Sequence, residues 1–229
     1  MPELAAVGWH GKLPTLGDFA TRRLDPAFIE AWDHWLSEGL AAMHLQPDWL
    51  DAYLASPSWR FLLMPGVLPG KTGEPAWVGV LMPSVDRVGR YYPLTLAHPL
   101  AAVPAASDEL DALWRWLAQL DEAARDALHD DWDITAFETK LAQMGVPRAS
   151  ASGVFAMLGA PQALPFDAHR RPAVAIPAQA ETAWRARTRG RAFWFADSDQ
   201  APARLLMSEG LESDGLASRL LGITPSGAP

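Results

Sequence analysis

The first residues whose spacing suggests chemistry form a glycine-rich stretch from Gly66 to Thr72, which reads Gly-Val-Leu-Pro-Gly-Lys-Thr. A phosphate-binding P-loop has four residues between its two glycines, whereas this stretch has three. We expect a strand directly after it, so that no helix N-terminus would face a phosphate group. The stretch is therefore interpreted as a turn between strands, and no nucleotide is expected to bind there.

Hydrolytic chemistry would need a nucleophile and a base, and Ser84, Asp86 and His98 supply the residue types for a triad. No Gly-x-Ser-x-Gly turn surrounds Ser84, so the local signature of a nucleophilic serine is missing. We predict that the chain is not an enzyme. A hydrolase that uses Ser84 or Asp86 is kept as an alternative that is not favoured.

Metal and thiol chemistry have little support in the sequence. The chain contains no cysteine, which removes disulfides, thiolate nucleophiles and cysteine-ligated metal sites. Its 6 histidines lack the close spacing that is typical of zinc ligands. We expect neither a metal ion nor another cofactor.

Two clusters of charged residues are the better candidates for a site. One lies in and after the loop 11–19, and the other lies in 83–90, between two apolar segments. Aspartate in a tight loop accepts backbone N–H bonds, and arginine pairs with carboxylates, so the clusters could brace their own loops. They could equally display a recognition surface. We favour bracing and keep both interpretations for Lys12, Asp18, Arg22, Asp86, Arg87 and Arg90.

The charge and hydropathy of the chain limit its partners. A formal net charge of −8 disfavours nucleic acid, whose backbone attracts basic surfaces. No apolar run approaches the ~20 residues of a membrane span, and the first residues do not resemble a signal peptide. We therefore predict a cytoplasmic protein that binds other proteins. The 11 tryptophans suit either a core or interface anchors, and we favour the core.

Helices and strands must position these clusters. Asp25 and Pro26 predict a helix start, and a 3.6-residue apolar period follows it. A short helix is expected from Pro47, with Leu54 among its buried positions. The segments 59–64, 77–82 and 92–97 are almost continuously apolar, which is typical of strands covered on both faces. Their short connections favour antiparallel pairing.

The remaining elements complete the predicted fold. We expect helices from Ser107 and after Asp133, strands at 192–196 and 204–207, a closing helix at 214–221 and one short strand near 173–176. The predicted class is α/β (α+β): a mainly antiparallel central sheet with helices on both faces, in three layers. Residues 1–98 and 99–229 are expected to pack together as one unit.

Several motifs carry a resemblance to a known family. They are Gly8-Trp9-His10-Gly11-Lys12-Leu13-Pro14 with Gly17-Asp18-Phe19, Trp32-Asp33-x-Trp35-Leu36, Tyr53-Leu54-x-x-Pro57-x-Trp59-Arg60-Phe61, and the segment 79–94 that contains Asp86-Arg87-Val88-Gly89-Arg90. In this order, they resemble the TagF (ImpM) family of type VI secretion accessory proteins.

The resemblance implies a post-translational negative regulator of type VI secretion. Members are thought to bind the scaffold protein Fha, which has a forkhead-associated domain, and to keep it out of the assembly. The family has no established catalytic residues to transfer. A structural subunit of the secretion apparatus is the alternative that we keep.

Overall fold

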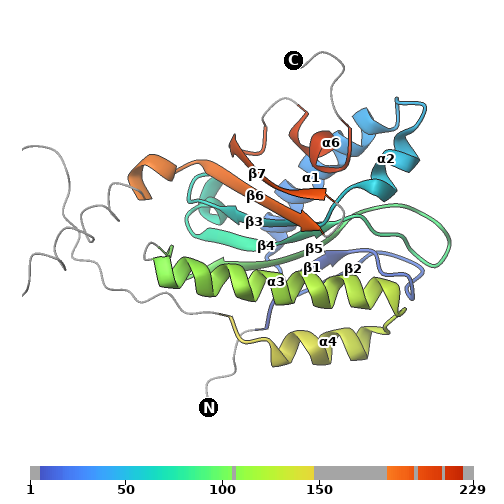
Figure 1. Cartoon of the computed structure of the whole chain (residues 1–229), viewed down its shortest axis with the longest axis horizontal. Coiled ribbons are helices and arrows are strands. Elements are labelled where there is room, and N and C mark those ends of the chain that lie inside the picture. Colours follow the sequence, from blue (N-terminus) through green and yellow to red (C-terminus); the bar gives the residue numbers. More distant parts are fainter. Residues whose placement is uncertain (1–5, 105–106, 147–184, 199–200, 213–214, 224–229) are drawn as a thin grey trace, which may run out of the picture.

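The computed structural model describes residues 6–104, 107–146, 185–198, 201–212 and 215–223. Its centre is a 7-stranded sheet in the order β2-β1-β5-β4-β3-β6-β7, and each neighbouring pair is antiparallel (Figure 1). The strands are β1 (Gly8–Gly11), β2 (Ala20–Arg22), β3 (Trp59–Leu63), β4 (Ala76–Met82), β5 (Leu94–Leu100), β6 (Arg191–Ser198) and β7 (Ala201–Glu209).

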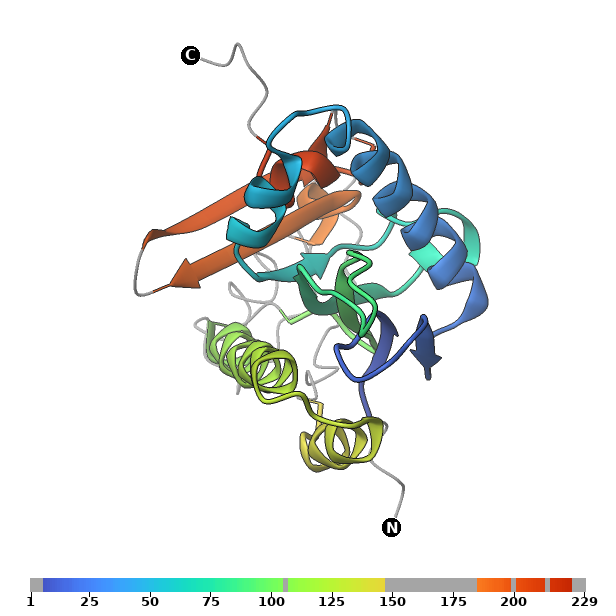
Figure 2. The ribbon, with the colours of Figure 1, turned by 90° about the vertical axis from the view of Figure 1, so that its right-hand side faces the viewer.

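Helices cover both faces of this sheet, which confirms the predicted fold class (Figures 1 and 2). One layer contains α1 (Pro26–Met43), α2 (Trp49–Ala55) and α6 (Leu216–Leu220), and the other contains α3 (Ser107–His129) and α4 (Ile134–Gln143). A short 3₁₀ helix, η1 (Gly70–Gly73), precedes β4. Among the described helices, none is long and apolar enough to cross a membrane.

Helix α1 begins as its sequence predicts. The Asp25 carboxylate accepts a hydrogen bond from the backbone N–H of Ala27, at 2.8 Å, and Pro26 occupies the first turn. The predicted apolar stripe is buried against the sheet. Its members are Phe28, Trp32, Trp35, Leu36, Leu40 and Met43.

Each face of the sheet has its own core. On the side of α1, aromatic rings dominate, and the fully buried Trp32 packs against Phe61 and Trp194. On the side of α3, aliphatic residues such as Leu117 and Leu120 pack against the other face. The nearly uninterrupted burial of β3 and β4 follows from this double cover and confirms the expectation for these strands.

Some local predictions are wrong. Strand β2 was not predicted, because three residues that are not fully buried show no usable alternation. Leu54 was expected to be buried but is 58% exposed, because it follows the buried Tyr53 in α2 and adjacent helical residues point about 100° apart. The short strand expected near 173–176 lies outside the described residues.

Strands from both parts of the chain join in the sheet. Strand β6 pairs with β3, with Phe61 opposite Trp194. This places a strand that follows residue 98 beside one that precedes it. We propose that residues 1–98 and 99–229 fold as one unit.

Candidate functional site

Two loops meet at one end of the sheet. The loops 12–19 and 83–91, here called the loop pair, follow β1 and β4, and they lie at the right-hand end of Figure 1. The backbone N–H of Arg87 donates to the Leu16 carbonyl at 2.9 Å, and the Ser84 hydroxyl donates to the Lys12 carbonyl at 2.7 Å. The antiparallel pairing of β1 and β4 with β5 brings the loops together.

Asp86 is the centre of the loop pair. Its carboxylate is fully buried, and Oδ1 accepts the backbone N–H groups of Val88, at 3.0 Å, and Arg90, at 2.9 Å. Its Oδ2 accepts Nε of Arg90 at 2.7 Å and lies 3.1 Å from Nζ of Lys12. Each carboxylate oxygen therefore has two donors, and the buried negative charge is fully satisfied.

These donors determine the ionisation of Asp86. Burial alone would raise the pKa of the carboxyl group, but the hydrogen bonds from Arg90, Lys12 and Val88 outweigh it. The pKa of Asp86 consequently lies well below the ordinary aspartate value. The group stays charged through the physiological range and acts as a brace.

Arg90 connects the two loops. While its Nε binds Asp86, its Nη2 donates to the Gly17 carbonyl and lies 3.8 Å from Oδ1 of Asp18. Lys12 adds a second connection, because its ammonium group donates to the Arg90 carbonyl at 3.3 Å. These contacts of Arg90 and Lys12 link the loop 83–91 to the loop 12–19.

Tyr53 supports the loop pair from α2. Its hydroxyl donates to the Ser84 carbonyl at 2.9 Å and accepts the Ser84 N–H at 2.8 Å. Tyr53 is fully buried, and this burial raises the pKa of its phenol above the ordinary value. The beginning of the loop 83–91 is thus fixed to the helical layer.

Apolar side chains project from this braced frame. Phe19 is 45% exposed and Val88 is 64% exposed. The Phe19 ring packs against Tyr92, with the ring centroids 4.8 Å apart, and Nζ of Lys12 lies 4.9 Å from the Phe19 centroid. Aromatic residues are enriched at binding hot spots, so the half-exposed Phe19 ring makes the loop pair a candidate protein-binding surface.

A second polar group lies beneath Phe19. The Tyr92 hydroxyl donates to Asp33, and Nδ1 of His10 lies 2.7 Å from the Thr21 hydroxyl oxygen. Burial lowers the pKa of His10 and raises that of Tyr92. His10 and Tyr92 are therefore uncharged at neutral pH, and they form a supporting layer for the exposed ring.

The structure brings together only part of the predicted set. Lys12, Asp18, Asp86 and Arg90 share one network. The backbone of Arg87 joins the loops, while its exposed side chain belongs to the surface. Arg22 lies apart on the edge strand β2, where its guanidinium binds the carbonyl of its own neighbour. The role of each residue in binding stays a proposal.

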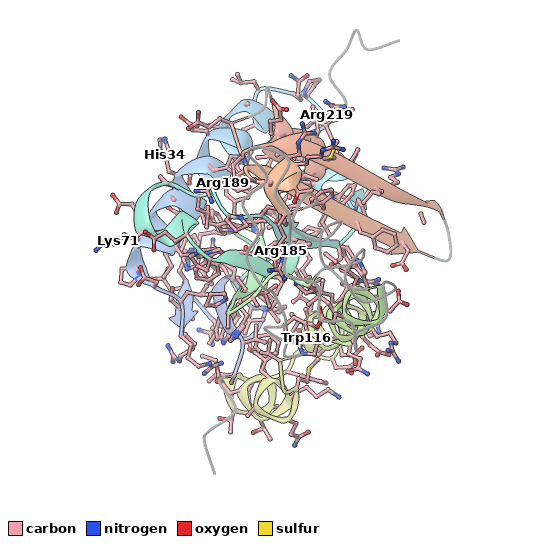
Figure 3. The ribbon with its side chains drawn as sticks, turned by 90° about the vertical axis from the view of Figure 1, so that its left-hand side faces the viewer. His34, Lys71, Trp116, Arg185, Arg189 and Arg219 are labelled. Carbon is pink, nitrogen blue, oxygen red and sulfur yellow. The ribbon has the colours of Figure 1, made fainter. Side chains whose placement is uncertain are left out.

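The alternative chemical sites are not assembled. Ser84 binds the Lys12 carbonyl and Asp86 binds two cations, whereas His98 pairs with Val78, near the opposite end of β4. In the glycine-rich stretch, the Gly66 N–H donates to the Gly73 carbonyl, and Lys71 points away from the body of the protein in Figure 3. Among the described residues, no group of three or more histidine or acidic side chains could hold a metal.

A second ionic cluster was not predicted from the sequence. The Arg60 guanidinium, on β3, binds Asp121 of α3 at 3.1 Å and Asp197 of β6 at 2.7 Å. Arg60 and Asp121 are both buried. The sequence offered one signal for this cluster, which is an arginine inside an apolar strand. A buried charge requires a partner, so Arg60 could have indicated a buried ion pair.

The Asp86 network predicts a pH dependence of stability. Because the folded pKa is lowered, ionised Asp86 stabilises the fold above the ordinary aspartate pKa of about 4, and this contribution is lost as the pH falls towards the folded pKa. Urea unfolding at neutral and acidic pH should show a smaller loss of stability for Asp86→Asn than for wild type. The exposed Asp51→Asn should follow wild type, and equal slopes for all three proteins would contradict the prediction.

Comparison with known proteins gives two matches. The sequence model described as "TagF N-terminal domain, Type VI secretion system-associated" matches residues 8–144. The chain is also similar to the crystal structure of PA0076 from Pseudomonas aeruginosa PAO1, with 34% sequence identity and a TM-score of 0.75. The match covers 98% of this chain and 97% of that chain. The search of curated proteins found no match.

Proposed function

Since the chain belongs to the TagF family of type VI secretion-associated proteins, we propose that it is a negative regulator of this system that acts by binding. The proposed partner is the scaffold protein Fha, which has a forkhead-associated domain. The proposed action is sequestration of the scaffold in the cytoplasm after translation, without catalysis. The family match supports the association with secretion, and the loop pair provides the surface.

The exposed side chains on the loop pair carry this proposal. Phe19 and Val88 project from a frame that Asp86 holds through buried hydrogen bonds. A partner would therefore meet an ordered surface and would not have to order it on binding. The exposed Arg87 adds a charged group for pairing at the same surface.

A binding measurement with purified Fha scaffold from the same cell tests the proposal. We expect Val88→Asp and Arg87→Glu to raise the dissociation constant by about 30-fold or more, which is the effect of losing a hot spot worth about 2 kcal/mol. Isothermal titration calorimetry would measure the dissociation constants of wild type and of each variant. Because these side chains are exposed, the melting temperature should be unchanged.

Leu45→Asp is the matched control, since Leu45 is 83% exposed, compared with 64% for Val88, and lies in the turn between α1 and α2. It should bind the scaffold with unchanged affinity. If wild type does not bind the scaffold, the proposed function is wrong. If all three variants bind like wild type, the loop pair is not the binding surface.

A further inference from the structure

Strand β7 forms a long edge of the sheet among the described strands. Its only strand neighbour among the described residues is β6, and the ribbon of these two strands forms one side of the molecule in Figure 2. The strand has 9 residues, whereas β2 at the opposite edge has 3. An edge strand presents unpaired backbone N–H and C=O groups, and proteins often limit this exposure by keeping the edge short. Strand β7 does not have that protection.

The open edge also has an exposed apolar face. Leu205 is 66% exposed and Met207 is 57% exposed, and they lie opposite Phe195 and Phe193 on β6. All four side chains point towards the side of α3, because alternate residues of a strand share a face. Trp114 of α3 reaches Phe195, with the ring centroids 5.7 Å apart. The helix therefore contacts β6, while Leu205 and Met207 remain largely exposed, with Nη1 of Arg191 lying 3.7 Å from the Met207 sulfur.

Charge does not protect this edge either. The run 205–208 contains no ionisable side chain. Glu209 is engaged by the Arg191 guanidinium of β6, at 3.2 Å. Arg204 is the one cation within the run 203–209. Natural edges that remain single commonly have lysine, proline or inward charges, and the proline of β7, Pro202, lies near the start of the strand, outside the run 203–209.

We propose that β7 pairs antiparallel with β7 of a second copy of this chain, around a twofold axis at Leu206. In this register, Leu205 lies opposite Met207 of the second copy, and Arg204 lies opposite its Ser208. The exposed apolar pair meets its counterpart on one face of a continuous sheet. The two copies of Arg204 lie four residues apart, about 14 Å along the strands, and do not oppose each other.

A second copy suits this edge because the edge is complementary to itself. Leu205 and Met207 of one copy cover Met207 and Leu205 of the other in the twofold arrangement. The pairing juxtaposes no like charges, and Glu209 of each copy keeps its Arg191 partner. The proposal does not depend on the secretion partner, because the loop pair lies on other strands.

Sedimentation equilibrium of the full chain, over a range of concentrations, tests the association. Wild type should form a dimer, and a variant with Leu205→Lys and Met207→Lys should have a dimer dissociation constant about 30-fold higher or more. Its melting temperature when monomeric should stay unchanged, since both side chains are exposed. Val88→Lys is the matched control and should dimerise like wild type. A monomeric wild type at all concentrations, or a lysine variant that dimerises unchanged, overturns the proposal.

Cysteine cross-linking tests the register, and it is unambiguous because the chain has no cysteine of its own. A mixture of Leu205→Cys and Met207→Cys should form the mixed disulfide under mild oxidation, since directly opposed Cβ atoms lie about 4.5–5.5 Å apart. Each variant alone should cross-link more slowly. If the mixture forms no more disulfide than Val88→Cys alone, the antiparallel pairing at Leu206 is overturned.

Discussion

Replacing Arg60 by alanine is expected to lower the free energy of unfolding by about 3–5 kcal/mol. The guanidinium binds Oδ2 of Asp121 through both Nε, at 3.2 Å, and Nη2, at 3.1 Å. Without it, a carboxylate that is only 3% exposed would have to stay charged in the interior or become protonated. Arg60 also binds Asp197, so the substitution breaks contacts among β3, α3 and β6.

Urea unfolding of matched variants separates the lost charge pair from lost packing. The double variant Arg60→Met with Asp121→Leu should be much closer to wild type than Arg60→Ala, because apolar residues of similar volume can replace a buried ion pair. Arg125→Ala should cost less than about 1 kcal/mol, since Arg125 is largely exposed and lies 3.5 Å from Asp121. A loss below about 1 kcal/mol for Arg60→Ala would show that the cluster does not stabilise the fold.

The most predictable parts of the fold are those that local chemistry determines. Asp25 and Asp133 were predicted as helix N-caps, and both accept backbone N–H bonds from the first turns of α1 and α4. The periodic stripe of α1 is buried because an amphipathic helix has one face to place against a sheet. The long apolar strands were predictable because a strand covered by helices on both faces is apolar at almost every position.

Tertiary pairing was not predictable from local pattern. Lys12 was predicted to lie with Asp18 and Arg22 because these residues are close in the chain. In the structure, Lys12 binds Asp86 instead, because β5 holds the ends of β1 and β4 together. Arg22 is displaced by β2, a strand with too few residues to give a pattern.

The same limit explains what was missed in the candidate site. Asp86 and Arg90 are four residues apart, so their pairing was one of several that the sequence left open. The exposure of Phe19 and Val88 was not foreseen, because apolar residues are usually assigned to the core. Only the packing of the surrounding strands determines which apolar residues stay outside. A recognition surface made of exposed apolar groups is therefore difficult to predict from composition.

Trp32→Ala is expected to destabilise the protein by about 3–5 kcal/mol. Trp32 is fully buried, and its ring centroid lies 4.8 Å from that of Trp35 and 5.2 Å from that of Phe61. Truncation would open a cavity between α1 and the sheet, into which rigid aromatic neighbours cannot readily collapse. The indole N–H also donates to the Thr95 hydroxyl at 2.8 Å, and Thr95 is itself fully buried.

Trp32→Phe separates the cavity from the hydrogen bond. It keeps an aromatic ring but removes the donor to Thr95, so a loss of about 1–3 kcal/mol is expected. Trp114→Ala is the control, because Trp114 is only partly buried on the other face and should cost less than Trp32→Ala. Chemical unfolding of the three variants ranks them. If Trp32→Ala costs no more than Trp114→Ala, the aromatic cluster beneath α1 does not stabilise the fold more than the partly buried contact of Trp114 on the other face.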